Sequence, residues 1–196
     1  QAGTPGRTRG VAARAAFRLA DIRKGSKILE AAWKKEPHPE IADIYVHARP
    51  GDSTHDRLDR AKKLQSLKRN HVESALAVAR AALDAGEFSI ARIEAEAAIR
   101  LGPREGVYLL LADIEEAETG DQGKVRQWLG RAVRAPRDPA WVADGLVAER
   151  WAPVSPVSGR IDAFEWKTPA ERLGQLVEPL DEEQEPKVPP PAPVKI

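Results

Sequence analysis

HVESALAVARAALDAGEFSIARIEAEAAIRL, residues 71–101, is the stretch that decides the fold of this chain. In each half the apolar residues recur every three or four positions, which is the spacing of an α-helix with one buried face. Ala85-Gly86-Glu87 separates the halves, and its glycine suits a tight turn. The stretch therefore predicts two antiparallel helices, 71–84 and 88–101.

The same pattern returns 34 residues later and predicts helices over 104–118 and 122–135. This offset aligns Gly86 with Gly120, Ala91 with Val125, Ala95 with Leu129, and Ala98 with Ala132. Helix pairs that repeat every 34 residues, with small residues where the helices cross, are the signature of tetratricopeptide (TPR) repeats. We therefore expect an all-α solenoid of TPR-type helical hairpins; the alternative is a helical bundle without repeats.

Earlier parts of the chain fit the same scheme. An offset of 66 aligns Pro37 with Pro103 and predicts helices over 8–23 and 25–36. The segment 40–70 has two helical patterns around Pro50-Gly51-Asp52, with Asp52-Ser53-Thr54 as the N-cap of the second. The predicted repeats are 6–39, 40–70, 71–103 and 104–137, followed by a cap over 138–168 and a tail over 169–196.

A TPR stack is a binding device, because its first helices line a concave groove. The groove positions expected from the repeat phase are Arg7, Arg14, Phe17, Arg18, Glu73, Leu76, Arg80, Leu83, Val107, Leu110, Ile114 and Glu118. Such a groove is cationic at one end and more apolar at the other, which suits a protein or peptide segment with acidic residues. The alternative is that the arginines only solvate a helix face.

Composition and charge exclude several classes of protein. The 196-residue chain has a net charge of +1, yet residues 1–70 hold 16 Lys/Arg against 8 Asp/Glu. This uneven balance disfavours uniform nucleic-acid binding. Cysteine is absent, which excludes disulfides and thiolate metal sites, and no apolar run is long enough to cross a membrane. Because the chain begins at Gln1, without a methionine, and continues directly into a helical pattern, we expect a fragment of a longer protein.

The sequence argues against an enzyme. It has no HExxH, no Gly-rich phosphate loop and no GxSxG motif. The histidines are His38, His47, His55 and His71. His47 and His55 with nearby aspartates match no metal-ligand spacing, and His71 is expected to be a surface or capping residue at the head of its helix. We predict no catalytic residue, no metal and no cofactor.

The closing segment, residues 138–166, lacks the helical pattern of the repeats; it reads DPAWVADGLVAERWAPVSPVSGRIDAFEW. Its prolines and glycines forbid a long helix, and AWVAD, ERWAPV and RIDAFEW are typical of short strands. Ser155 and Ser158, with Ala143 and Leu146 twelve residues earlier, are spaced like the two C-x-x-C halves of a zinc ribbon. We expect a small β-type cap that resembles a metal-free zinc ribbon. The alternative is an ordinary hydrophobic strap over the open end of the solenoid.

Without metal, aromatic burial must hold such a cap together. We expect Trp141, Trp151, Phe164 and Trp166 to pack against the last helix of the solenoid. After residue 168, ERLGQLVEPL predicts a short helix, and the acidic, proline-rich remainder predicts disorder, or else a polyproline ligand.

The TPR-like repeats, together with this closing segment, resemble the HemY family in its alphaproteobacterial form. The resemblance covers most of residues 1–168 and is most specific in the closing segment. It implies a bacterial inner-membrane protein with N-terminal membrane helices absent here and a soluble, cytoplasm-facing domain. It also implies a non-catalytic scaffold in late haem (protoporphyrin) biosynthesis, whose partners are tetrapyrrole-pathway enzymes.

Two different functions stay open beside this one. The adaptor LapB, of lipopolysaccharide assembly, also combines TPR repeats with a zinc knuckle, so the chain could instead be an adaptor in envelope assembly or proteolysis. The groove could also bind haem or a porphyrin directly.

Overall fold

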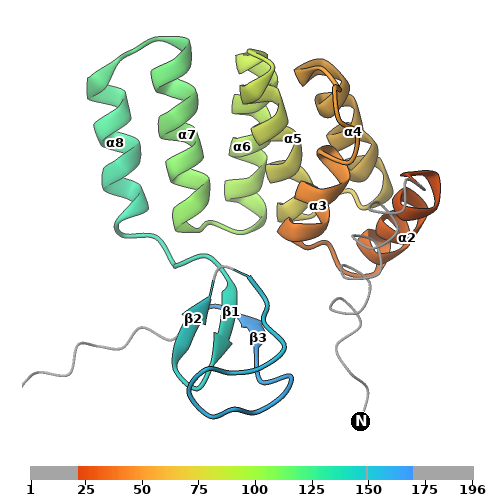
Figure 1. Cartoon of the computed structure of the whole chain (residues 1–196). Coiled ribbons are helices and arrows are strands. Elements are labelled where there is room, and N and C mark those ends of the chain that lie inside the picture. The colour runs from red at the N-terminus through yellow and green to blue at the C-terminus, as the bar shows by residue number, and fades with distance from the viewer. Residues whose placement is uncertain (1–21, 149, 170–196) are drawn as a thin grey trace, which may run out of the picture.

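The computed structural model describes residues 22–148 and 150–169 of the chain. This part is mostly helical and closes with a small antiparallel sheet. The helices stand side by side in sequence order, and the sheet lies beneath their ends (Figure 1). Their bounds are α2 (Ile22–Lys35), α3 (Pro39–Val46), α4 (Thr54–Leu67), α5 (Val72–Asp84), α6 (Phe88–Leu101), α7 (Glu105–Glu118) and α8 (Gln122–Ala132).

Six of these helices form three pairs with a regular period. The first helices, α3, α5 and α7, begin at residues 39, 72 and 105, and the second helices, α4, α6 and α8, begin at residues 54, 88 and 122. Each helix packs against its sequence neighbours, and α3 and α7 also contact α5. The prediction of paired helices between residues 40 and 135 is therefore confirmed.

The predicted boundary between the helices 8–23 and 25–36 is misplaced, because α2 already includes residues 22–24. Gly25 lies within this helix and is buried. Its missing side chain allows close packing there. Most of the helix predicted over 8–23 lies outside the described residues.

Alanine dominates the main core, as the close approach of paired helices requires. Ala79, Ala82, Ala91, Ala95 and Ala98 have no exposed surface. They belong to one cluster that extends from α3 to α7, with larger side chains supplied by α3, α4, α5 and α7. A second cluster surrounds Trp33, Tyr45 and Leu64 and holds α2 and α3 against α4.

Side-chain caps mark where α3, α4, α5 and α8 begin. Ser53 and Asp56 form a reciprocal capping box at the start of α4, as predicted from Asp52-Ser53-Thr54. His38 and His71 cap α3 and α5, and each accepts a hydrogen bond at Nδ1 from the backbone N–H two residues later, at 3.2 Å. The expectation that His71 is a capping residue is confirmed.

The sheet has the strand order β2-β1-β3. Its strands are β1 (Ala140–Ala143), β2 (Leu146–Ala148) and β3 (Glu165–Lys167). The strand predicted in ERWAPV is misplaced, because the second strand comes earlier. Asp144 and Gly145, with φ of 50° and 79°, form a two-residue turn that brings β2 directly back along β1.

The sheet does not cover the last helix, so the expected packing of its aromatic residues against α8 is wrong. Trp141 Nε1 donates a hydrogen bond to Glu40 Oε1 (2.9 Å) at the start of α3. The His38 ring lies 4.2 Å from the Trp166 ring and 5.3 Å from the Trp141 ring, between centroids. Trp141 and Phe164 are buried, and Trp151 and Trp166 are partly buried, in a small core of the sheet's own.

The linker from α8 to β1 explains this placement, because it runs back beneath the first helices. The Glu105 N–H donates to Pro136 O (2.8 Å), and the Gly106 N–H donates to Asp138 Oδ2 (2.6 Å). A Cβ on Gly106 would lie 2.8 Å from both Asp138 oxygens, so only glycine admits this carboxylate without a shift. Arg104 then joins Asp138 (2.7 Å) to Glu73 on α5 (2.6 Å).

Candidate functional site

Five of the eight predicted groove residues that the structure describes are buried. Glu73, Leu76, Val107, Leu110 and Ile114 are all buried, between 0% and 6% exposed. Side chains so enclosed hold helices together and cannot line an open groove, so the repeat phase used for them needs correction. Arg7, Arg14, Phe17 and Arg18 lie outside the described residues.

Of the other expected positions, Arg80 and Glu118 are exposed and Leu83 is partly buried. Arg80 lines a small hollow between α3 and α5, whereas Glu118 lies at the far end of α7 and borders a different pocket. The structure therefore does not bring the predicted set together.

The hollow between α3 and α5 has an apolar floor and a charged rim. Its volume is about 90 Å³. The rim consists of Asp43 from α3, His47 just after α3, and Arg80 and Asp84 from α5. The floor consists of Pro39, Ala42, Val46, Ala77 and Ala81. This surface between two first helices can hold one apolar side chain of a bound segment while its rim selects charge. We call it the α3–α5 hollow.

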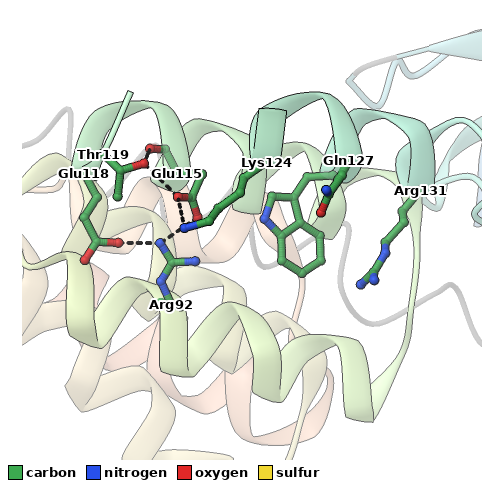
Figure 2. Close-up of a pocket in the computed structure, with 8 residues that line it drawn as sticks. Arg92, Glu115, Glu118, Thr119, Lys124, Gln127 and Arg131 are labelled. Atoms are coloured by element: carbon green, nitrogen blue, oxygen red, sulfur yellow. Dashed lines mark hydrogen bonds and ion pairs between the residues drawn. The ribbon is translucent and has the colours of Figure 1, made fainter. Parts of the chain in front are cut away.

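A larger and more polar pocket opens where α6, α7 and α8 meet (Figure 2). Its volume is about 460 Å³, and it is lined by Arg92, Glu115, Glu118, Thr119, Lys124, Gln127, Trp128 and Arg131. Arg131 lies over the Trp128 ring at 4.8 Å.

Glu115 is the centre of this pocket's charge network. It is 2% exposed and lies 3.0 Å from Arg92 Nη2 and 3.5 Å from Lys124 Nζ. The Thr119 hydroxyl, which donates to it at 2.7 Å, and the Arg92 guanidinium hold the pKa of Glu115 below its usual value. Arg92 also pairs with Glu118. These paired charges join α6, α7 and α8.

In place of a metal ion, the proposed zinc frame holds the carboxylate of Asp144. Ser155 and Ser158 each donate a hydroxyl hydrogen bond to Asp144 Oδ2, both at 2.5 Å. These two bonds hold the pKa of Asp144 below its usual value. Ala143 and Leu146 are paired across the hairpin on either side of Asp144-Gly145. Asp144 was missed from the sequence, although Asp-Gly between apolar residues is a strong hairpin signal.

Two further features of the described residues bear on function. None of the described helices is long and apolar enough to cross a membrane. Within residues 22–148 and 150–169, no three histidine or acidic side chains come close enough together to bind a metal ion.

Comparison with known proteins gives a distant similarity. No family model matches the chain. The chain is 27% identical, over 155 residues, to a "Probable magnetosome protein Mms48" from Magnetospirillum gryphiswaldense. The aligned region covers 75% of this chain and 34% of that protein, so the chain spans about a third of the relative's length.

Proposed function

We propose that this chain is a non-catalytic scaffold, a TPR-type solenoid that binds protein or peptide segments along its first helices. The observation that carries the proposal is the α3–α5 hollow, where an apolar floor is framed by charges on two equivalent helices of consecutive pairs. The 33-residue spacing of the first helices supports a repeated inner surface of this kind.

The setting of this scaffold is proposed on the HemY resemblance. In that setting the full-length protein is attached to the bacterial inner membrane, the domain faces the cytoplasm, and the partners are enzymes of tetrapyrrole synthesis. The closing sheet, in this reading, descends from a zinc ribbon in which Asp144, Ser155 and Ser158 have taken over the metal's structural role.

The distant similarity to a probable magnetosome protein favours a second setting for the same scaffold, assembly of magnetosome proteins. A third setting is that of an adaptor in envelope assembly or proteolysis. These three settings share the binding surface and differ in the partner. Direct binding of haem or a porphyrin is a separate function, because it needs a small-molecule site and no partner protein.

Site-specific crosslinking in the full-length protein tests the surface and the setting together. A photo-crosslinking residue replaces Arg80 on the rim of the hollow, and a matched one replaces Lys62, which is exposed on α4. We expect partner proteins to crosslink at position 80 at least several-fold more than at position 62. Recovered tetrapyrrole enzymes support the HemY setting, whereas magnetosome proteins or envelope components support the second or the third setting. Equal crosslinking at both positions contradicts the proposed surface.

Hemin addition tests porphyrin binding separately. We expect the Soret band of hemin to be unchanged by the purified chain. A shifted band that saturates at one equivalent, and that is lost in Arg80→Glu, would replace the scaffold with a porphyrin-binding protein.

A further inference from the structure

Helix α8 exposes the side that its counterpart α6 buries. In α6, Arg92 pairs with Glu115 and Glu118, so this residue faces α7. Ala95 and Ile99 follow it at helical spacing on the same side; Ala95 has no exposed surface, and Ile99 packs against the main core. Arg92, Ala95 and Ile99 thus mark the surface of α6 that α7 covers.

Helix α8 begins 34 residues after α6, so the positions equivalent to these three are Arg126, Leu129 and Val133. Leu129 is 41% exposed and Val133 is 86% exposed, the largest value among the exposed apolar side chains of the described residues. Arg126 is exposed and has no ion-pair partner within residues 22–148 and 150–169. We call Arg126, Leu129 and Val133 the α8 outer face. It has both components of the α6–α7 contact, an apolar stripe and an arginine, and no helix within residues 22–148 and 150–169 covers it.

The contact that α6 makes defines what would fit the α8 outer face. Helix α7 presents a stripe of Val107, Leu110, Leu111 and Ile114, all at most 6% exposed. Two carboxylates, Glu115 and Glu118, follow the stripe and meet Arg92. The required pattern is an amphipathic helix with apolar residues at i, i+3, i+4 and i+7 and carboxylates at i+8 and i+11.

Charge supports an acidic occupant. Arg126, Arg131, Arg134 and Arg137 lie on α8 or in the turn after it. Lys124 also lies on α8, but it pairs with Glu115 and Asp121. The two aspartates that flank this region are both engaged, Asp121 in capping α8 and Asp138 in binding Arg104 and Gly106. The surface around Leu129 and Val133 therefore attracts a helix that ends in carboxylates.

We propose that the α8 outer face binds an amphipathic helix of a partner protein, with an apolar stripe followed by two carboxylates as in α7. This inference does not depend on the α3–α5 hollow, which lies at the other end of the array. The bound helix continues the helix order of the array, antiparallel to α8, with its carboxyl end at Arg126.

Peptide binding to the whole 196-residue chain tests the proposal. The probe is a fluorescently labelled peptide with the sequence of residues 103–119, and fluorescence anisotropy reports its binding. We expect Val133→Asp to weaken binding at least tenfold, because it places a charge in the apolar stripe, and Arg126→Glu to weaken it several-fold. Arg80→Glu in the α3–α5 hollow should leave the affinity unchanged, which separates this site from the proposed function.

A charge reversal makes the test specific. A peptide with arginine at the positions of Glu115 and Glu118 should bind the Arg126→Glu chain several-fold more tightly than it binds the original chain. Because Val133 and Arg126 are exposed, helical circular dichroism should be unchanged in both variants. Equal affinity of the original chain and Val133→Asp, or no recovery on charge reversal, would overturn the proposal.

Deletion of residues 170–196 identifies the source of the helix. Leu173, Leu176, Val177 and Leu180 repeat the apolar spacing of α7, and Asp181 follows. We expect the shortened chain to bind the peptide with the same affinity as the whole chain. A several-fold gain would show that the chain's own end already occupies the face, and would overturn the assignment to a partner protein.

Discussion

The helical array and the closing sheet are stabilised in opposite ways. The array repeats one kind of contact, in which fully buried alanines and leucines are shared between neighbouring helices over the whole cluster. The sheet depends on three buried residues, Trp141, Ala143 and Phe164, and on a carboxylate held by two serines. The array therefore distributes its stability, whereas the sheet concentrates it at a few positions. Substitutions should therefore be able to destabilise the sheet without destabilising the helical array.

The largest expected effect is that of Phe164→Ala. Phe164 is 1% exposed in the smallest core of the molecule, and such a truncation costs about 4 kcal/mol. We expect the sheet to unfold while the helices remain. Tryptophan fluorescence should then change at a denaturant concentration where the circular dichroism at 222 nm is still native. A single transition that includes both signals would show that the two regions are one cooperative unit.

Arg104→Met should affect both regions, since Arg104 joins α7 to Glu73 on α5 and to Asp138 in the linker. Removing the arginine leaves the buried Glu73 without its cation, at a cost of about 3 kcal/mol. Both the fluorescence and the helical transition should move to lower denaturant. Arg80→Met is the matched control, because Arg80 is exposed, and it should change the stability by less than about 0.5 kcal/mol.

Much of the array could be predicted from the sequence, because each helix pair repeats a local pattern. The segment 71–101 contains its own apolar period and its own turn, and the helices α5 and α6 begin and end within one residue of the expected positions. The groove could not be predicted in the same way. Whether Leu76 or Arg80 faces outward depends on how each helix pair is rotated relative to the next pair. The spacing of apolar residues within one helix does not determine that rotation.

The presence of a β-unit could be predicted from the sequence, but the surface on which it packs could not. Its aromatic and turn residues indicated a β-unit, yet its position depends on Glu40 and His38, about a hundred residues earlier. Two local signals were available for its interior. Asp144-Gly145 marks the hairpin, and Asp144 is the acceptor that two serines at metal-ligand spacing require.

Ser155→Ala should have a smaller effect, confined to the sheet. Ser155 is 1% exposed, donates to Asp144, and accepts hydrogen bonds from the backbone N–H groups of Val157 and Ser158. Its loss should cost about 2 kcal/mol, because the two backbone N–H groups lose their acceptor at a buried position. Ser158 is exposed, so Ser158→Ala should cost less. Fluorescence-detected unfolding of the two variants gives the comparison, and a larger loss in Ser158→Ala would contradict it.

The smallest expected effect is a pH dependence at His38. Burial lowers the pKa of His38, against the opposing carboxylates of Glu40, Glu73 and Glu36. The unfolded chain therefore takes up the proton first, and stability falls as the pH drops from above 6.5 towards the lowered pKa. Protonation at Nδ1 also removes the acceptor that caps α3.

His71 provides the matched control for this prediction. It caps α5 as His38 caps α3, and burial lowers its pKa in the same direction. Asparagine caps helices well and does not titrate in this range. His38→Asn should remove the fluorescence change of the sheet between about pH 7.5 and 5.5, and His71→Asn should leave that change in place. The opposite pattern would show that α5, and not the sheet contact, responds to pH.

The hydrogen bond from Trp141 to Glu40 has a consequence for the order of folding. It joins residues 101 positions apart, whereas the helix pairs assemble from contacts about a third as distant in sequence. Closing the longer loop costs about 1 kcal/mol more in chain entropy, and distant contacts form slowly. We therefore expect a growing chain to complete the three described helix pairs before the sheet docks on them.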